Sequence, residues 1–486
     1  MKKRTTSIHT SLLYLSVVSV LLITGFTGCK SFVQVDPPIS GITSATAYAT
    51  DKSASAVVTG IYAEIMSANT ALTQGTSGIP YLMGLYADEL QNHAASNVTR
   101  EQYYQNNLQN TAVVTPFWNS LYGALYNCNA AVEGISKSGT LSQPAKDRLL
   151  GEAKFMRAFL LFYATNLFGD IPMPLTTDYV INNTITRSPQ AKVYEQIIAD
   201  LQEAQTLLDN DYKTGDGNLT EDKAHPNKQA ATALLARVYL YVQNWQQAEA
   251  LAGSLIADGR YELETDLLKV FLANNKEAIW QLAFTASTNF ANLDIDYYTL
   301  TPASGPDAFR TATMSASLVN AFEPGDQRLS VWVGRNDVTA TPTTPGGSFW
   351  YSRKYRDKTP GTEYLAVLRL SEQLLIRAEA RAQQGNLTGA QTDLDAVRTR
   401  AGLPAVTATT KEALLAAILH ERQVEFFLEW GHRWFDLKRS GKANEVMSVV
   451  TPQKGGVWNT NWLLLPVPQA ELLINRNLTQ NPGYPS

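Results

Sequence analysis

The sequence is poor in metal-binding and redox-active side chains, because its 486 residues include only two cysteines and five histidines. This composition excludes a disulfide framework and a thiolate zinc site, and it leaves little for a histidine metal cage. The motifs of zincins, dinucleotide-binding loops, phosphate-binding loops and hydrolase nucleophile elbows are also missing. We therefore expect no metal and no cofactor.

Positive charge is not in excess either, since 40 lysines and arginines face 44 aspartates and glutamates. Without a basic patch or stripe, nucleic acid is not an expected partner. Aromatic residues are plentiful, with 16 Phe, 22 Tyr and 9 Trp, whereas charged residues make up 17%. The chain can therefore bury a sizeable core, and its length suits one large domain or two to three ordinary ones.

The first residues carry an export signal. Basic residues 2–4 precede an apolar run from Leu12 to Phe26, which is shorter than the ~20 residues that span a bilayer. Thr27 and Gly28 then lead to Cys29, an arrangement that resembles a bacterial lipobox. We predict that residues 1–28 are removed, that Cys29 is lipidated and that residues 29–45 form a tether. The alternative is an ordinary secretory signal with an unrelated cysteine.

The remaining chain is dominated by amphipathic helical patterns. Aromatic and apolar residues recur on one face of the segment from Glu152 to Leu167, and residues 46–68, 117–135 and 191–208 behave similarly. None of these segments is apolar enough to cross a membrane. We expect a helical body in which a lipid anchor is the only attachment to a membrane.

Two segments follow the pattern of tetratricopeptide helix pairs, in which small residues let neighbouring helices approach closely. The two pairs lie far apart in the sequence, which excludes an uninterrupted solenoid. Between them, residues 260–360 are rich in loop-forming residues, and residues 276–284 read as a short strand. The pattern residues are Ala236, Tyr239, Ala248 and Ala252 in the first pair, and Ala378, Ala390 and Leu394 in the second.

GEAKFMRAFLLFYATNLFGDIPMP, from Gly151 to Pro174, resembles the signature helix of the SusD/RagB family of outer-membrane nutrient-binding lipoproteins. Residues 371–403, 420–442 and 463–484 are similar to further segments of that family, in the same order. The resemblance implies a mainly α, single domain over residues 46–486, built on four tetratricopeptide-like helix pairs with a loop-rich insertion and a few short strands.

The same resemblance implies a function. Such a protein is lipid-anchored to the cell outer membrane, faces the exterior, and binds a glycan or similar nutrient without catalysis. It delivers this ligand to a SusC-like TonB-dependent transporter. Two alternatives stay open: a surface glycoside hydrolase, and a structural transporter subunit without ligand affinity.

Two acidic segments invite a catalytic or metal-binding interpretation. Glu421 and Glu425 lie one helical turn apart and point the same way, whereas the two carboxylates of a glycosidase flank the substrate. We expect these residues to form ion pairs, with Arg422 and Arg433 nearby. The segment from Asp209 to Asp222 resembles a calcium loop superficially, but a lysine stands where a third oxygen ligand is needed, so we expect a solvated acidic loop.

Non-catalytic sugar binding needs aromatic rings for stacking, together with amide, carboxylate and guanidinium groups for the hydroxyls. Two stretches, residues 86–107 and 289–310, contain this mixture, and residues 350 and 351 follow a Gly-Gly turn that offers a third wall. The alternative for any single tyrosine is a place in the core. The predicted ligand-binding residues are Asp88, Asn92, His93, Arg100, Tyr103, Tyr104, Phe290, Asp296, Tyr297, Tyr298, Trp350 and Tyr351.

Overall fold

The structure is a computed structural model that describes residues 44–67, 70–73, 75–284, 292–340 and 346–485. The chain divides into two compact units, residues 1–47 and 48–486. In the first unit the described part is helix α2 (Ser44–Ala47). The predicted signal peptide, Cys29 and most of the tether therefore lie outside the described residues. Within those residues, no helix is both long enough and apolar enough to cross a bilayer.

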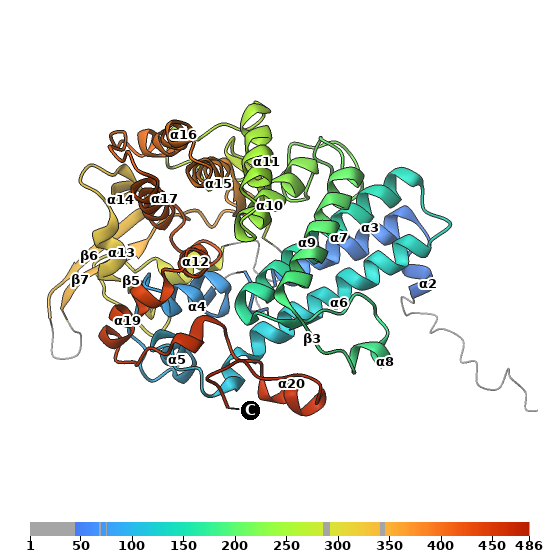
Figure 1. The fold of residues 1–486 in the computed structure, drawn as a ribbon, viewed down its shortest axis with the longest axis horizontal. Helices are drawn as coiled ribbons and strands as arrows, with labels where there is room; N and C mark the ends of the chain where they lie inside the picture. The colour runs from blue at the N-terminus through green and yellow to red at the C-terminus, as the bar shows by residue number, and fades with distance from the viewer. Residues whose placement is uncertain (1–43, 68–69, 74, 285–291, 341–345, 486) are drawn as a thin grey trace, which may run out of the picture. The chain divides into compact units, whose positions relative to one another are not determined.

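The second unit is mainly helical, as predicted. Its longer helices form four pairs that pack one after another, and a further helix packs on the last pair (Figure 1). The pairs are α3 (Asp51–Ile65) with α6 (Thr115–Lys137), α7 (Gln143–Phe168) with α9 (Gln190–Leu207), α10 (Lys228–Tyr241) with α11 (Trp245–Ala257), and α15 (Leu370–Gln383) with α16 (Leu387–Arg400), followed by α17 (Lys411–Glu425).

Local sequence signals set the ends of these helices. Thr50 and Ser53 form a capping box at the start of α3, in which each side chain accepts a hydrogen bond from the backbone N–H of the other. Gly169 ends α7 with φ of 75°. The positive φ favours glycine, and a Cβ atom at this position would stand 2.6 Å from Cδ1 of Leu464, so a larger residue would also displace that side chain.

The two tetratricopeptide-like pairs lie side by side although a long insertion separates them in sequence. Ala248 of α11 and Ala378 of α15 are both fully buried, and these two helices pack directly against each other. The sequence correctly indicated two separate repeats. The two repeats are separated along the chain by the insertion of residues 260–360. They are nevertheless neighbours in space, because α15 follows the insertion and packs against α11.

The insertion and its surroundings contain short antiparallel strand pairs and short helices. Strand β4, predicted within residues 276–284, pairs with β8 directly before α15. The strand pairs are β1 (Leu90–Asn92) with β5 (Ala312–Met314), β2 (Ile171–Pro172) with β3 (Arg187–Ser188), β4 (Ala278–Leu282) with β8 (Leu365–Arg369), and β6 (Val333–Val338) with β7 (Gly347–Ser352). The shorter helices are α4 (Ile79–Tyr86), α5 (Val98–Tyr104), α8 (Tyr179–Asn182), α12 (Leu293–Tyr298), α13 (Ala316–Ala321), α14 (Gln327–Trp332), α18 (His432–Arg439), α19 (Ala443–Gln453) and α20 (Gln469–Ile474).

A buried network of ion pairs joins the insertion to the C-terminal helices. The carboxylate of Glu425 lies 2.9 Å from Arg328, 2.9 Å from Arg369 and 2.5 Å from Arg400. Its side chain is fully buried. Glu425 therefore links α17 to β8, α14 and α16, and its oxygens are occupied by guanidinium groups.

Glu421 belongs to the same network, so the predicted ion pairing of the two glutamates is confirmed. Its oxygens lie 2.6 Å from Arg328 and 3.3 Å from Arg398. The partners differ from the arginines nearest in sequence, because Arg422 and Arg433 pair with aspartates elsewhere. Buried charges of this kind hold helices in one arrangement and are not free for substrate.

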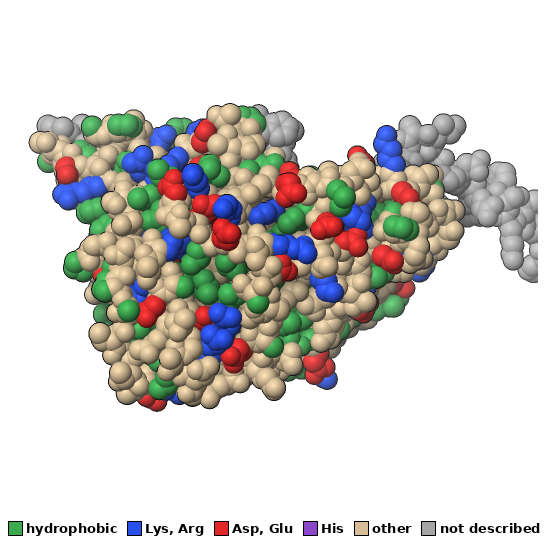
Figure 2. Space-filling model, turned by 90° about the horizontal axis from the view of Figure 1, so that it is seen from above, with side chains coloured by type: hydrophobic (Ala, Val, Ile, Leu, Met, Phe, Trp, Pro, Cys, Tyr) green, Lys and Arg blue, Asp and Glu red, His purple; other side chains and the backbone are tan. Residues whose placement is uncertain are grey.

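Exposed charges are mixed in sign. Figure 2 shows lysine and arginine side chains intermixed with aspartate and glutamate over the visible face. In the acidic loop between α9 and α10, Lys213 pairs with Asp209. Within the described part of the chain, no group of three or more His, Cys, Asp or Glu side chains is arranged to hold a metal ion.

Candidate functional site

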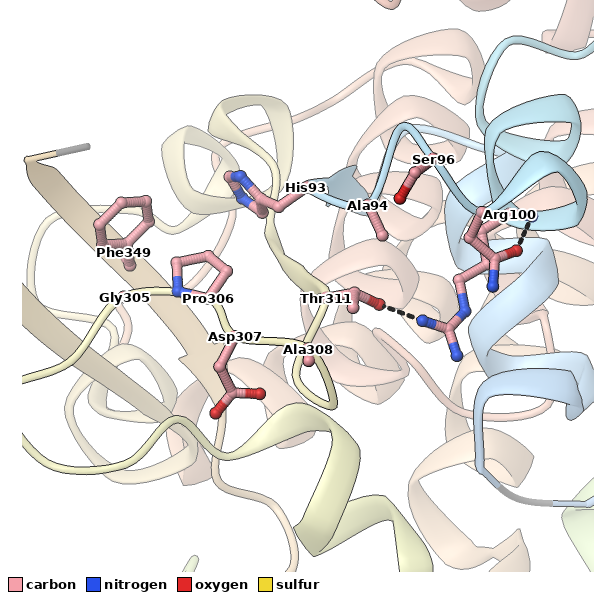
Figure 3. Close-up of a pocket in the computed structure, with 11 residues that line it drawn as sticks. His93, Ala94, Ser96, Arg100, Gly305, Pro306, Asp307, Ala308, Thr311 and Phe349 are labelled. Atoms are coloured by element: carbon pink, nitrogen blue, oxygen red, sulfur yellow. Dashed lines mark hydrogen bonds between the residues drawn. The ribbon is translucent and has the colours of Figure 1, made fainter. Parts of the chain in front are cut away.

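A pocket of about 610 Å³ lies where three segments from distant parts of the sequence meet. One wall follows β1 and enters α5, the second is the loop between α12 and β5, and the third is a ring from β7 (Figure 3). This volume is in the range of small-molecule sites. The lining residues are His93, Ala94, Ser96, Asn97, Arg100, Gly305, Pro306, Asp307, Ala308, Thr311 and Phe349.

Strand pairing positions the first two walls. The register of β1 and β5 places Asn92 opposite Ala312, and the His93 N–H donates to the Thr311 carbonyl at 2.7 Å. Asn97 then caps α5 by accepting a hydrogen bond from the Arg100 N–H at 3.0 Å. The first contact joins the segment 93–100 to the end of the loop 305–311, and the second sets the start of α5.

Two aromatic rings line one side of the pocket. His93 and Phe349 meet edge to face, with ring centroids 5.7 Å apart. The imidazole Nε2 shares a hydrogen bond of 2.8 Å with the Thr313 hydroxyl, which fixes the ring. Loss of solvation lowers the pKa of His93 below its ordinary value, so the ring is neutral at pH 7. A Cβ on Gly305 would stand 3.1 Å from Phe349, so glycine lets the loop pass close to that ring.

The opposite side of the pocket is polar. Arg100 donates from Nη1 to the Thr311 hydroxyl at 2.6 Å and from Nη2 to the Thr76 hydroxyl at 3.0 Å. Oδ1 of Asp307 accepts hydrogen bonds from the backbone N–H groups of Phe309 and Arg310, and Oδ2 lies 2.8 Å from the Arg310 guanidinium. Among the described residues lining the pocket, Asp307 is the one carboxylate, so this part of the wall lacks the two flanking carboxylates that a glycosidase uses.

The two sequence stretches predicted as walls meet at this pocket, but of the eleven predicted residues that the structure describes, only His93 and Arg100 line it. Asp88 is buried and held by two hydrogen bonds of 2.7 Å from Arg433. Asn92 is also buried and donates to Glu101 at 2.7 Å. These two polar side chains serve the fold rather than the pocket.

The predicted tyrosines of α5 lie in the core. Tyr103 is 0% exposed and packs between the rings of Tyr86 and Phe117. Tyr104 is also buried, with Lys454 above its ring. Because α5 is amphipathic, its aromatic side chains point inward while Asn97 and Arg100 at its start reach the pocket. The core alternative holds for both tyrosines.

The residues predicted from α12 also lie outside the pocket lining. Tyr298 is 5% exposed and packs on the ring of Tyr81. Tyr297 is half-buried beside Gly75, and Asp296 pairs with Lys358 at the surface. Phe290 lies outside the described residues.

Strand β7 contributes Phe349 to the pocket, and not Trp350 or Tyr351, the two residues predicted from this strand. Phe349 lines the pocket, whereas Trp350 points to the other face, where the Arg335 guanidinium stands 5.1 Å from the centre of its ring. Tyr351 is buried against Gly334. Alternation along the strand separates Phe349 from Trp350, and of the two aromatic residues on the Phe349 face, Phe349 lines the pocket whereas Tyr351 does not. Sequence reasoning also missed Asn97, Asp307 and Thr311, which carry no signal beyond their place in a polar loop.

Comparisons with known proteins identify the family. The sequence profile of the SusD family matches residues 175–484, and a profile described as starch-binding associating with outer membrane matches residues 71–240. The SusD-like protein P2 of Formosa agariphila is 28% identical over 76% of this chain and 81% of its own. A SusD-like protein of Bacteroides ovatus is 22% identical over 66% of this chain and 64% of its own.

Solved structures share the fold. A laminarin-binding SusD-like protein superposes with a TM-score of 0.74 at 23% identity, covering 89% of this chain and 99% of its own. The surface glycan-binding protein A of Bacteroides thetaiotaomicron gives a TM-score of 0.74 at 17% identity, covering 90% and 99%. From the profile that spans most of its length, the chain belongs to the SusD family.

Proposed function

We propose that this protein binds an oligosaccharide non-covalently at the outer membrane and passes it to a SusC-like TonB-dependent transporter. The observation that carries the proposal is a pocket of about 610 Å³ whose lining combines the Phe349 ring with Arg100 and Asn97. An aromatic face stacks on the apolar C–H patches of a sugar ring, while amide and guanidinium groups bind its hydroxyls.

The comparisons support this function. One matching profile is described by starch binding and association with the outer membrane, and two relatives of the same fold are named for laminarin binding and for surface glycan binding. The pocket also lies on the two stretches in which the sequence combines aromatic and polar residues. The identity of the sugar is not fixed by these relatives, because stacking surfaces accept many ring types.

Binding is tested by calorimetry of the mature chain against a panel of neutral and acidic oligosaccharides. We expect saturable binding to at least one of them, without release of shorter products on long incubation. Hydrolysis of a bound member would support the glycoside hydrolase alternative instead. Absence of binding to the whole panel, together with retention of the transporter, would support the structural-subunit alternative.

The anchor and the partner need separate experiments. We propose that Cys29 is lipidated and that the protein faces the exterior, so Cys29→Ala is expected to move it from the membrane fraction to a soluble fraction. In intact cells, the wild-type chain is expected to be accessible to external protease. The transporter is expected to co-purify with a tagged wild-type chain extracted in mild detergent, and its absence would contradict the partnership.

A further inference from the structure

Arg100 is a cation in the pocket wall whose recorded partners are all neutral. Its guanidinium donates to the hydroxyls of Thr311 and Thr76, and it stands 5.9 Å from the centre of the Tyr81 ring. Each contact holds the side chain in place without cancelling its charge. The planar guanidinium is thus positioned before any ligand arrives.

No carboxylate among the described residues lies within 4.0 Å of this guanidinium. The segments outside the described ranges contain a single acidic residue, Asp36. Other arginines of the same region differ, since Arg310 pairs with Asp307 and Arg433 pairs with Asp88. Among the described residues, these neighbouring arginines are therefore paired with carboxylates, whereas Arg100 has no counter-ion.

The remaining charges of the pocket do not compensate Arg100. His93 is neutral at pH 7, because loss of solvation lowers its pKa. The carboxylate of Asp307 is matched by the Arg310 guanidinium at 2.8 Å. Although the whole chain carries a formal net charge of −4, this pocket has one uncompensated positive charge.

Arg100 also faces a second hollow. A pocket of about 250 Å³ lies beyond the first, and both include Arg100 and Asn97 in their walls. Thr76, whose hydroxyl accepts a hydrogen bond from Nη2 of Arg100, lines this second pocket. Thr311, whose hydroxyl accepts a hydrogen bond from Nη1, lines the first. The guanidinium is therefore part of the wall of both pockets, so a saccharide bound in either of them can reach it.

We propose that Arg100 selects a saccharide that carries an anionic group, either the carboxylate of a uronic acid or a sulfate ester. Guanidinium binds both groups through two parallel N–H bonds, and such charge-assisted bonds are stronger than bonds to neutral hydroxyls. The inference rests on the proposed glycan-binding function, and it adds the charge of the ligand to it. Phe349 and Arg100 line the same pocket, so one bound saccharide can contact both side chains.

The test compares pairs of ligands with the same sugar backbone, in which one member carries the anionic group and the other does not. Affinity electrophoresis first screens acidic polysaccharides (pectin, alginate and carrageenan) against neutral ones (laminarin, xylan and starch). Calorimetry then compares oligogalacturonate with its methyl ester, and a sulfated carrageenan oligosaccharide with its desulfated form. We expect the acidic member of one pair to bind about tenfold to hundredfold more tightly, with the difference shrinking as salt is raised from 50 to 500 mM. The pair that shows the difference identifies carboxylate or sulfate.

Variants assign the effect to Arg100. Arg100→Gln is expected to abolish the preference for the acidic member, whereas Arg100→Lys retains part of it because the charge remains but the planar fork is lost. Arg335→Gln is the matched control, because Arg335 is exposed, pairs with Asp337 and lies outside the pocket. Thermal unfolding of each variant shows whether it is folded. If Arg100→Gln does not fold, the test still stands on Arg100→Lys.

The outcomes separate the two proposals. Binding of neutral saccharides with equal or higher affinity than their acidic counterparts would overturn the anionic selectivity and leave glycan binding intact. A preference for acidic ligands that survives Arg100→Gln in a folded variant would also overturn it. Binding of no saccharide in the panel would reject both the selectivity and the proposed function.

Discussion

His93 and Phe349 meet edge to face at the candidate pocket, with ring centroids 5.7 Å apart and ring planes at 78°. The two residues come from distant parts of the sequence, one following β1 and the other on β7. Their contact closes one side of the pocket with a fixed aromatic wall. This wall is the apolar surface on which a sugar ring would stack.

Replacing the Phe349 ring tests that role. We expect Phe349→Ala to weaken oligosaccharide binding by about 1–3 kcal/mol, the usual loss when a central aromatic contact is removed. Trp350→Ala is the matched control, because Trp350 is the next residue of the same strand but contacts Arg335 on the other face. Calorimetry that finds the larger loss with Trp350→Ala would contradict the assignment of the wall.

Glu425 tests the interpretation of the buried carboxylates. Burial alone would favour its protonated form, but Arg400, Arg369 and Arg328 hold the pKa of Glu425 well below its ordinary range. We expect Glu425→Gln to lower the free energy of unfolding by about 3–5 kcal/mol, since it leaves buried arginines short of a partner. Denaturant unfolding measures this loss. The ligand affinity of the folded variant should be unchanged. If the wild type hydrolysed the ligand and the folded variant did not, Glu425 would be a catalytic residue.

The ion pair of Asp88 and Arg433 should also matter for stability and not for binding. Asp88 is 2% exposed, and both of its oxygens accept hydrogen bonds of 2.7 Å from Arg433. We expect Asp88→Asn to cost about 3–5 kcal/mol of stability because Arg433 stays buried without a charge partner. A double-mutant cycle with Arg433→Met gives the coupling. A folded Asp88→Asn variant with much weaker ligand binding would return Asp88 to the site.

Glu89 gives a prediction of pH dependence. Burial raises the pKa of Glu89 to about 8, while one of its oxygens accepts the Leu428 N–H at 3.1 Å. Between its unfolded pKa of about 4.3 and the folded value, only the unfolded chain releases the proton, so the folded state loses stability as pH rises. Glu89→Gln mimics the protonated side chain. Its free energy of unfolding is therefore expected to rise, relative to that of the wild type, by about 2–4 kcal/mol as the pH is raised from 5 to 8. A difference in unfolding free energy that does not change with pH would contradict this.

Much of the fold could be predicted from the sequence because its signals are local. The apolar face of residues 152–167 indicates α7, and the small residues at 236, 248, 378 and 390 indicate close helix packing. The packing of α11 against α15 could not be predicted, since it depends on how the insertion folds back. The partners of Glu421 were also out of reach, because Arg328 is far from it in the sequence.

The site could be predicted as two stretches and not as individual residues. Helix α5 has seven residues, which is too short for periodicity to show which face is buried, so the sequence alone does not separate a core position for Tyr103 from a pocket position. On β7 the choice between Phe349 and Trp350 depends on strand register, and a shift of one residue exchanges the two faces. Composition located the walls, but the orientation of each side chain required the three-dimensional structure.

The central claim is tested most directly by a crystal structure of the mature protein with the oligosaccharide that binds it best. We predict a sugar ring stacked on Phe349, with hydrogen bonds from the segment that contains Asn97 and Arg100. Ligand density at another surface, with the pocket between these residues empty at saturating concentration, would contradict the account.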